Sequence, residues 1–460
     1  MRWTTTMLVW LVSRGLVLWL LLGPHSWVAG DAEYFSRSLD RVGAVGLGHV
    51  LVEYPLPAVG LLAIPKLLVE LSGHPGSYAA LVCVMAVLTD AGFTALLHGA
   101  DRRHPRPWGL GVWLLAVPLL GATGYARFDL APGVLVGAAL LLVLSRPRLA
   151  GVVAAVATGL KLWPLVILPV LAARGGARWP VVRAFAGTGM LLAGVSLLLG
   201  GWSRLVSPLV WQADRGLQIE SVLATPAMLR WRGQDTFTVG YTDHNAFEVF
   251  GPGVPLLLVG TQVLGVLLVA GLAALWWRAW RLEDRLTAEA MTWVVLAAVT
   301  GLMVSSKVLS PQYLLWLLPA AAAGLALAGA RPRLIGWCAV LLVTTGLTQL
   351  VFPVLYGGLI ARGPESGVAI VVLTLRNVLL VGLTAGAWWQ AWRTLREPLS
   401  AATRWNASRP ARRRATRPPC GDARTTPSAA GPKSGRPARP RPRPGARRRG
   451  RRSPRGTRRP

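Results

Sequence analysis

The sequence is short of cysteine and of acidic residues. Its 460 residues include three cysteines and 19 Asp and Glu, and only 15% of all residues are charged, whereas 53% are hydrophobic. Two of the cysteines, Cys83 and Cys338, lie in apolar stretches, so neither a disulfide framework nor a metal-binding spacing is predicted. A soluble domain of this length usually carries more charge. Repeated apolar stretches therefore indicate a protein that crosses a membrane several times.

Nucleotide and metal motifs are also missing. The sequence has no Walker loop and no GxGxxG after a predicted strand, which argues against a nucleotide cofactor. His244, in "YTDHN", has no neighbours at the spacing of metal ligands. We therefore expect no cofactor, and nothing in the sequence calls for a metal.

The positive charge is concentrated at the C-terminus. The net charge is +30, and residues 401–460 hold 20 Lys and Arg against one acid, Asp422. This Arg- and Pro-rich segment lacks apolar residues to bury, so it is predicted to be disordered. We expect a membrane domain at 1–400 and a cytoplasmic tail at 401–460 that contacts anionic lipids. Nucleic-acid binding is a weaker alternative and is not expected.

The apolar stretches predict ten membrane spans. They lie at about 7–23, 78–99, 108–123, 131–145, 184–200, 254–277, 288–304, 313–329, 334–352 and 367–388. The first lacks a clear cleavage site and is interpreted as an uncleaved helix. The basic loops, such as "DRRHPRP" at 101–107, are placed in the cytoplasm by the positive-inside rule. Both termini are then cytoplasmic.

Two further apolar segments cannot cross the membrane if every basic loop is to lie in the cytoplasm. The proline-containing segment 55–71 is interpreted as a helix in the outer leaflet. The segment 150–173 is basic at both ends and broken at "KLWP", so a re-entrant hairpin is favoured over a single crossing. The predicted fold is an all-α polytopic membrane protein in the cell membrane.

This topology places the polar segments that are not basic loops on the extracytoplasmic side. They are 24–54, 124–132, 201–253 and 305–313. Since residues far apart in sequence would share this face, we expect the functional site there.

The first of these segments contains Asp31 and Glu33. A carboxylate at a membrane boundary can accept a proton from a hydroxyl group, the role of a general base. The alternative is a solvated loop acid. Glu53, at the start of the outer-leaflet helix, is a further candidate that could instead anchor that helix.

Charged residues inside a membrane protein are functional candidates, because burying them costs free energy unless they are paired. Arg127 and Asp129, in "RFD", could bind substrate or could pair with each other to stabilise a helix turn. Lys161, in "KLWP", could bind a phosphate or could pair with a carboxylate such as Asp90.

The two later segments add polar groups suited to a phosphate or a sugar. "SSKVLSPQY" contains Lys307, Ser310, Gln312 and Tyr313 at a helix junction marked by proline. "DRGLQIES" contributes Arg215 and Glu220 from the long outer segment.

Five motifs in order resemble glycosyltransferase family 87, whose members are common in actinobacteria and are also classed under a domain of unknown function, DUF2029. They are "GDAEYF…VEYPLP", "RFDLAPGVLVGAALLLVL", "AGVVAAVATGLKLWPLVILP", "DRGLQIESVLATP" and "SKVLSPQYLLWLLP". The resemblance covers about residues 5–395. It implies a GT-C enzyme that transfers a sugar, mannose being the best known, from a polyprenyl-phosphate donor to a glycolipid or polysaccharide acceptor on the extracytoplasmic face.

The resemblance also implies roles for particular residues. Asp31 matches the essential acid of the first extracytoplasmic loop, Lys161 matches the lysine of the "KxWP"-like motif, and Ser310–Tyr313 match "SPQY". Arg127, Asp129, Arg215 and Glu220 are carried as candidate pocket residues. In the implied reaction Asp31 deprotonates the acceptor hydroxyl, and Lys161, Lys307 or Arg127 balances the phosphate charge while the anomeric carbon is inverted.

Two other classes of function remain open at this point. A transporter or lipid flippase also carries intramembrane charges and broken helices. A membrane assembly protein could use the basic tail to recruit partners, although this would leave "DAEY", "KLWP" and "SPQY" without a purpose.

Overall fold

The computed structural model describes residues 2–73, 78–102 and 104–396. Within these residues helices dominate, and the one sheet is an antiparallel hairpin of β1 (Thr238–Thr242) and β2 (Ala246–Phe250). The chain divides into two compact units, 1–399 and 400–460. The second unit lies outside the described residues, and so does the predicted tail.

Eight helical segments of the described chain are long and apolar enough to cross a membrane, and each coincides with a predicted span. They contain α1 (Trp3–Leu22), α5 (Tyr78–Asp101), α11 (Gly175–Asp214), α13 (Val254–Leu282), α14 (Ala288–Ser305), α15 (Leu314–Ala328), α16 (Pro332–Gln349) and α18 (Ser366–Thr394). The predicted all-α polytopic membrane fold is therefore confirmed.

The other two predicted spans are shorter than expected. They correspond to α6 (Trp108–Leu120) and α8 (Leu130–Leu142), each of 13 residues. A 13-residue helix is about 20 Å long, which is less than the hydrocarbon thickness of about 30 Å. Most of their side chains are buried against other helices. The Arg127–Asp129 segment lies between them in the chain and directly precedes α8.

The segment after α8 runs into the bundle and returns to the same end. Helix α9 (Pro147–Leu160) leads to Lys161, and η4 (Trp163–Ile167) and α10 (Leu168–Leu171) lead away from it. Gly151 in α9 lies against the backbone of Val181 and Gly159 lies against Leu192, so α9 and α11 run in the same direction. The chain has thus come back to the end where α9 began. This is the hairpin path predicted for 150–173.

A buried ion pair joins α1 to α5. Asp90 lies in the middle of α5 and accepts hydrogen bonds from Arg14 at 2.8 and 3.0 Å. Trp10, Trp113 and Tyr125 also donate to this carboxylate. Such pairing is what a charge at membrane depth requires. The alternative that Asp90 pairs with Lys161 is therefore wrong, because Asp90 is already surrounded by donors from three other elements.

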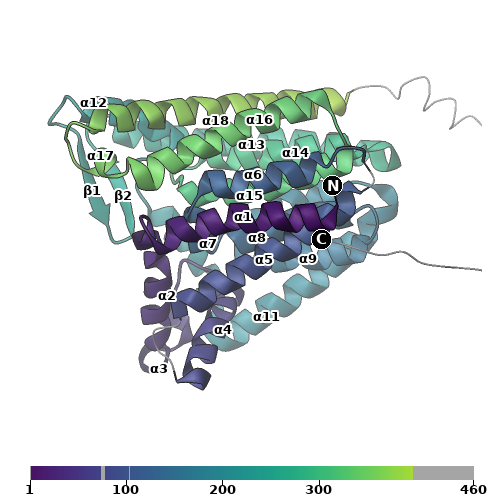
Figure 1. Ribbon diagram of the computed structural model, residues 1–460, viewed down its shortest axis with the longest axis horizontal. Coiled ribbons are helices and arrows are strands. Elements are labelled where there is room, and N and C mark those ends of the chain that lie inside the picture. The colour runs from purple at the N-terminus through teal and green to yellow at the C-terminus, as the bar shows by residue number, and fades with distance from the viewer. Residues whose placement is uncertain (1, 74–77, 103, 397–460) are drawn as a thin grey trace, which may run out of the picture. The chain divides into compact units, whose positions relative to one another are not determined.

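The short elements gather at one end of the bundle. Figure 1 shows the β1–β2 hairpin with α12 (Thr225–Trp231) and α17 (Gly357–Ile360) at this end, and the N-terminus at the opposite end. Helices α2 (Gly30–Asp40), α3 (Val42–Val45) and α4 (Leu56–Ser72) pack together around a separate apolar cluster. Helix α7 (Thr123–Ala126) precedes Arg127. The four polar segments predicted to share one face converge here.

Candidate active site

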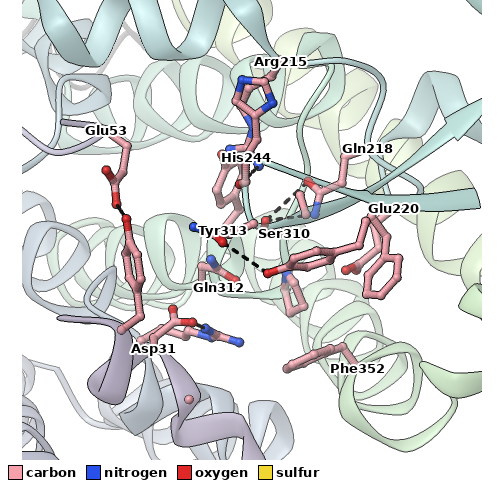
Figure 2. Close-up of a pocket in the computed structure, with 18 of the residues that line it drawn as sticks. Asp31, Glu53, Arg215, Gln218, Glu220, His244, Ser310, Gln312, Tyr313 and Phe352 are labelled. Carbon is pink, nitrogen blue, oxygen red and sulfur yellow. Dashed lines mark hydrogen bonds and ion pairs between the residues drawn. The ribbon is translucent and has the colours of Figure 1, made fainter. Parts of the chain in front are cut away.

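A cavity of about 490 Å³ opens where these segments meet. Its wall combines ionisable, amide and aromatic side chains from elements that are far apart in the sequence, many of them drawn in Figure 2. Nine of the eleven predicted site residues line it: Asp31, Glu53, Arg127, Lys161, Arg215, Glu220, Ser310, Gln312 and Tyr313. The other two, Asp129 and Lys307, lie behind the wall.

Asp31 occupies the first turn of α2, where the helix dipole favours a negative charge. Its side chain is 35% exposed and forms an ion pair with Arg127, which is 13% exposed. Burial lowers the pKa of Arg127, but the charge and hydrogen bond of Asp31, together with the charges of Tyr54 and Asp129, outweigh burial and the pKa is raised. The ring of Phe352 lies 5.5 Å from the guanidinium carbon. Arg127 thus holds the Asp31 carboxylate in place at the cavity wall.

Lys161 and Asp129 form a second ion pair, with 2.6 Å between Nζ and Oδ1. The indole of Trp316 donates to the same carboxylate oxygen at 2.5 Å. Since Arg127 and Asp129 take partners from other elements, the alternative that they pair with each other is wrong. The lysine Nζ is also 5.4–6.0 Å from the ring centres of Tyr54, Tyr313 and Trp316. Its charge is therefore already compensated on several sides.

Glu53 lines the cavity and accepts a hydrogen bond from the hydroxyl group of Tyr34 at 2.7 Å. Burial and the neighbouring Glu53 charge both raise the pKa of Tyr34, so the phenol keeps its proton and remains a donor. This contact fastens α2 to the chain just before α4. Glu53 is thus tied to the cavity wall.

The strand-like segment after α11 carries Arg215 and Gln218. The backbone N–H of Gly216 donates to Glu248 of β2 at 2.9 Å, and a Cβ at Gly216 would overlap the Glu248 carboxylate. Any larger residue here would therefore displace the Glu248 carboxylate from this hydrogen bond. The Gln218 side chain hydrogen-bonds Ser310 at 3.3 Å. These contacts bring the β1–β2 hairpin, the segment that follows α11 and the "SPQY" motif to one wall of the cavity.

Lys307 does not reach the cavity. Its ammonium group donates to the backbone carbonyl of Ala213 at 2.8 Å, near the C-terminal end of α11. Burial lowers the pKa of Lys307, although Glu248 opposes this. A lysine in this position satisfies a free carbonyl at a helix end. The interpretation of Lys307 as a substrate-binding cation is not supported by its position.

Glu220 is 1% exposed and forms a buried ion pair with Arg376 of α18, with 3.1 Å between Oε2 and Nη2. Burial raises the pKa of Glu220 to about 7, and the charge of Arg376 only partly offsets this. A carboxyl group in the cavity wall thus changes charge near neutral pH. Arg376 lies within a predicted span, and the rule that intramembrane charges are candidates could have identified it.

Several aromatic wall residues were not predicted as site residues. They come from three different segments of the chain: Trp27, Tyr34, Tyr54, Trp211, Tyr241, His244, Phe247, Phe352 and Tyr356. Trp211 and His244 meet edge to face at 5.1 Å, and Phe352 meets Tyr356 at 5.0 Å. The clustering of aromatic residues in the outer segments was a usable signal for some of them. Phe352 and Tyr356 gave no such signal, because they belong to an apolar stretch interpreted as a span and its end.

Chemically, the cavity offers a carboxylate, guanidinium and ammonium groups, neutral hydrogen-bond donors and aromatic faces. Such a set suits a substrate with hydroxyl groups and a negative charge. Within the part of the chain that the structure describes, no group of three or more His, Cys, Asp or Glu side chains is placed to hold a metal ion.

Comparison with known proteins adds one finding. Residues 53–306 match the family model of glycosyltransferase family 87. No curated protein matches the chain. The matched region contains Lys161, Arg215 and Glu220 of the cavity wall, whereas Asp31 precedes it.

Proposed function

Because this chain belongs to glycosyltransferase family 87 and is a membrane-embedded glycosyltransferase, we propose that its cavity transfers a sugar from a polyprenyl-phosphate donor to a glycolipid or polysaccharide acceptor. Mannose is the sugar we propose. The chain would lie in the cell membrane with the cavity facing the extracytoplasmic side and both termini in the cytoplasm.

The observation that carries this proposal is the Asp31 carboxylate at the wall of a cavity that also contains cations. Asp31 accepts the proton of an acceptor hydroxyl group, and the oxygen attacks the anomeric carbon of the donor sugar. The bond between that carbon and the phosphate oxygen breaks, its electron pair stays with the phosphate, and the configuration is inverted. Arg127 keeps Asp31 oriented toward the reacting hydroxyl.

An apolar groove near the cavity suits the polyprenyl chain. This groove, of about 380 Å³, lies between α2–α4 and α11, and its lining includes Leu39, Leu56 and Leu192. Leu39 is one helical turn from Phe35, which lines the cavity, and Leu56 closely follows Glu53 and Tyr54. A donor with its sugar phosphate in the cavity could thus place its isoprenoid chain in the groove. Because lipid tails are as apolar as the leucines of the groove, the isoprenoid chain could enter it from the bilayer without a transfer penalty.

The acceptor would enter past the β1–β2 hairpin, where Tyr241, His244 and Asn245 line the rim of the cavity. Tyr241 is exposed and its hydroxyl group donates to the Asn245 amide oxygen at 3.3 Å. An aromatic face beside an amide can contact both the apolar face and the hydroxyl groups of a sugar ring. This supports a carbohydrate-bearing acceptor.

A transporter or flippase is a less suitable function for this arrangement. Transport sites lie near the middle of the membrane between repeated halves. The cavity is instead lined in part by the β1–β2 hairpin, which lies at one end of the bundle (Figure 1), and the family match is to a transferase. An assembly protein would not need a cavity with an oriented carboxylate.

The test is to incubate the purified full chain with labelled polyprenyl-phosphate sugars and a panel of glycolipid and polysaccharide acceptors. We expect labelled product with inverted anomeric configuration from at least one donor, with mannose the leading candidate. If a folded preparation transferred no label from any polyprenyl-phosphate sugar, the proposal would be wrong.

A further inference from the structure

The positively charged residues of the cavity wall differ in whether they already have an anionic partner. Three of them are at least half-buried: Arg127, Lys161 and Arg215. Arg127 is paired with Asp31 and Lys161 with Asp129. A fourth, Arg37, is 76% exposed at the rim and near Glu33. The charges of Arg127 and Lys161 are therefore largely compensated before any substrate binds.

Arg215 has no such partner. Among the described residues it forms no ion pair, and its Nη2 makes one long contact, 3.5 Å to the carbonyl oxygen of His244. Its Nε is buried without a hydrogen-bond partner. The Nε of Arg127 is also buried without a hydrogen-bond partner. Arg127, however, forms an ion pair with Asp31, and Arg215 forms none among the described residues. A partly buried guanidinium without an anion is unfavourable, and a bound anion would relieve this.

The backbone around Arg215 is well supported. Gly216 donates to Glu248 at 2.9 Å and Gln218 donates from its backbone to Lys307 at 3.0 Å. Lys307 in turn satisfies the carbonyl of Ala213. The backbone that carries Arg215 is consequently held by contacts to β2 and to the segment before "SPQY", so the main chain would not have to become ordered when the guanidinium binds a ligand.

Arg215 and Asp31 lie on different sides of the cavity. In Figure 2, Arg215 stands beside His244 at one edge of the group and Asp31 at the opposite edge, with Ser310 and Tyr313 between them. In an inverting transfer the attacking hydroxyl and the leaving phosphate lie on opposite faces of the anomeric carbon. If Asp31 receives the proton, the phosphate belongs on the side where Arg215 lies.

We propose that Arg215 is the principal binding group for the donor phosphate, in place of Lys161, Lys307 or Arg127. The inference rests on the proposed function. When the carbon–oxygen bond breaks, the phosphodiester with one negative charge becomes a phosphomonoester with up to two. The acceptor proton passes to Asp31 and the new glycosidic bond completes the balance. A cation without a partner, placed where this charge develops, stabilises the leaving group, and a guanidinium can bind two phosphate oxygens at once.

The experiment measures binding of polyprenyl phosphate, the product without its sugar, to the purified full chain. Arg215→Gln is compared with Arg215→Lys, and Arg230→Gln is the control because Arg230 is an exposed arginine of α12 outside the cavity. We expect Arg215→Gln to weaken binding at least about tenfold, the scale of a charge-assisted hydrogen bond. Arg215→Lys should retain part of the affinity, and Arg230→Gln should match the unmodified protein. Unfolding temperatures recorded without ligand establish that each variant is folded.

Transfer kinetics then show whether the phosphate that Arg215 binds is that of the sugar donor. Arg215→Gln should raise the KM for donor and lower kcat, because the leaving phosphate loses its counter-charge, and should leave the KM for acceptor unchanged. Unchanged polyprenyl-phosphate binding, or a rise in acceptor KM alone, would overturn the inference. If the unmodified protein binds polyprenyl phosphate through Arg215 but transfers no sugar, the proposed function fails while the binding assignment stands.

Discussion

At the residue scale, the partner of a charged side chain decides what it can do. Asp31 and Glu33 lie in the same turn of α2, yet Asp31 faces the cavity beside Arg127. Glu33 is 75% exposed and only 3.9 Å from Arg37. An exposed pair of this kind contributes little stability. The two acids, similar in sequence context, therefore have different surroundings.

We expect Asp31→Asn to reduce sugar transfer by about 10²- to 10⁴-fold, because the amide cannot accept the hydroxyl proton. The assay is transfer of labelled mannose from polyprenyl-phosphate mannose in membranes with equal amounts of protein. Glu33→Gln, in the same helical turn, should keep normal turnover. Near-normal transfer by Asp31→Asn would rule it out as the base.

Glu220 makes stability depend on pH. Its folded pKa of about 7 lies above its ordinary value of 4.5 because of burial, opposed by Arg376 and Arg127. The folded state therefore favours the neutral carboxyl. This contribution is fully present below about pH 4.5 and is lost as pH rises through about 7. We expect the unfolding temperature of the purified protein to fall across this window.

Glu220→Gln should flatten that profile, since an amide has no charge to gain. The measurement is tryptophan fluorescence during heating at a series of pH values. Glu33→Gln should retain the original slope. An equally steep profile in Glu220→Gln would show that another group is responsible.

At the element scale, close helix packing positions the site. Helix α8 begins beside Asp129 and lies against α15, where a Cβ at Gly133 would overlap the carbonyl oxygen of Leu315. The next residue, Trp316, donates to Asp129. The glycine contact thus brings α15 close enough for Trp316 to hydrogen-bond Asp129, the carboxylate that pairs with Lys161.

Gly133→Ala should destabilise the protein by about 1–3 kcal/mol, the usual cost of overpacking, and should also lower transfer. Thermal unfolding and the transfer assay measure the two effects. Gly189→Ala in α11 is the matched control, because a Cβ there meets nothing within 4 Å. Equal stabilities of the two variants would show that α8 can shift away from α15 without loss.

Helix lengths show where hydropathy alone was insufficient. The span predicted at 184–200 is part of α11, which continues through Gly201 (φ 74°) to Asp214. That extension carries Trp211 and Arg215 to the cavity. Hydropathy detects the lipid-facing part of a helix but not a continuation that packs against polar loops. Hydropathy also overestimated the lengths of α6 and α8, because their apolar sequence is buried in protein and not in lipid.

At the scale of the whole molecule, every cavity-lining residue lies between Trp27 and Tyr356. The basic segment 401–460 is outside the described residues. We expect its deletion to leave sugar transfer within about twofold of the full chain. Transfer assayed in membranes with matched protein amounts tests this. Loss of activity at equal abundance would assign the tail a role in catalysis or assembly.

The proposed orientation can be tested by cysteine labelling with a membrane-impermeant reagent. In a background without Cys83, Cys338 and Cys420, Asp243→Cys in the hairpin should be labelled in intact cells. Ser145→Cys, in a basic loop, should be labelled only after the membrane is permeabilised. Labelling in the reverse order would invert the topology and move the cavity to the cytoplasm.

The sequence alone determined the membrane class, the position of eight spans, the segments whose polar residues meet and nine of the residues of the cavity wall. These features depend on composition and on the order of apolar and charged segments, which are local properties of the chain. The tertiary structure alone decided which charges are paired. Arg127 meets Asp31 instead of Asp129, two residues away, and Lys161 meets Asp129 instead of Asp90. Pairing depends on distances between elements far apart in sequence, and only the packed helices set those distances and leave Arg215 without a carboxylate.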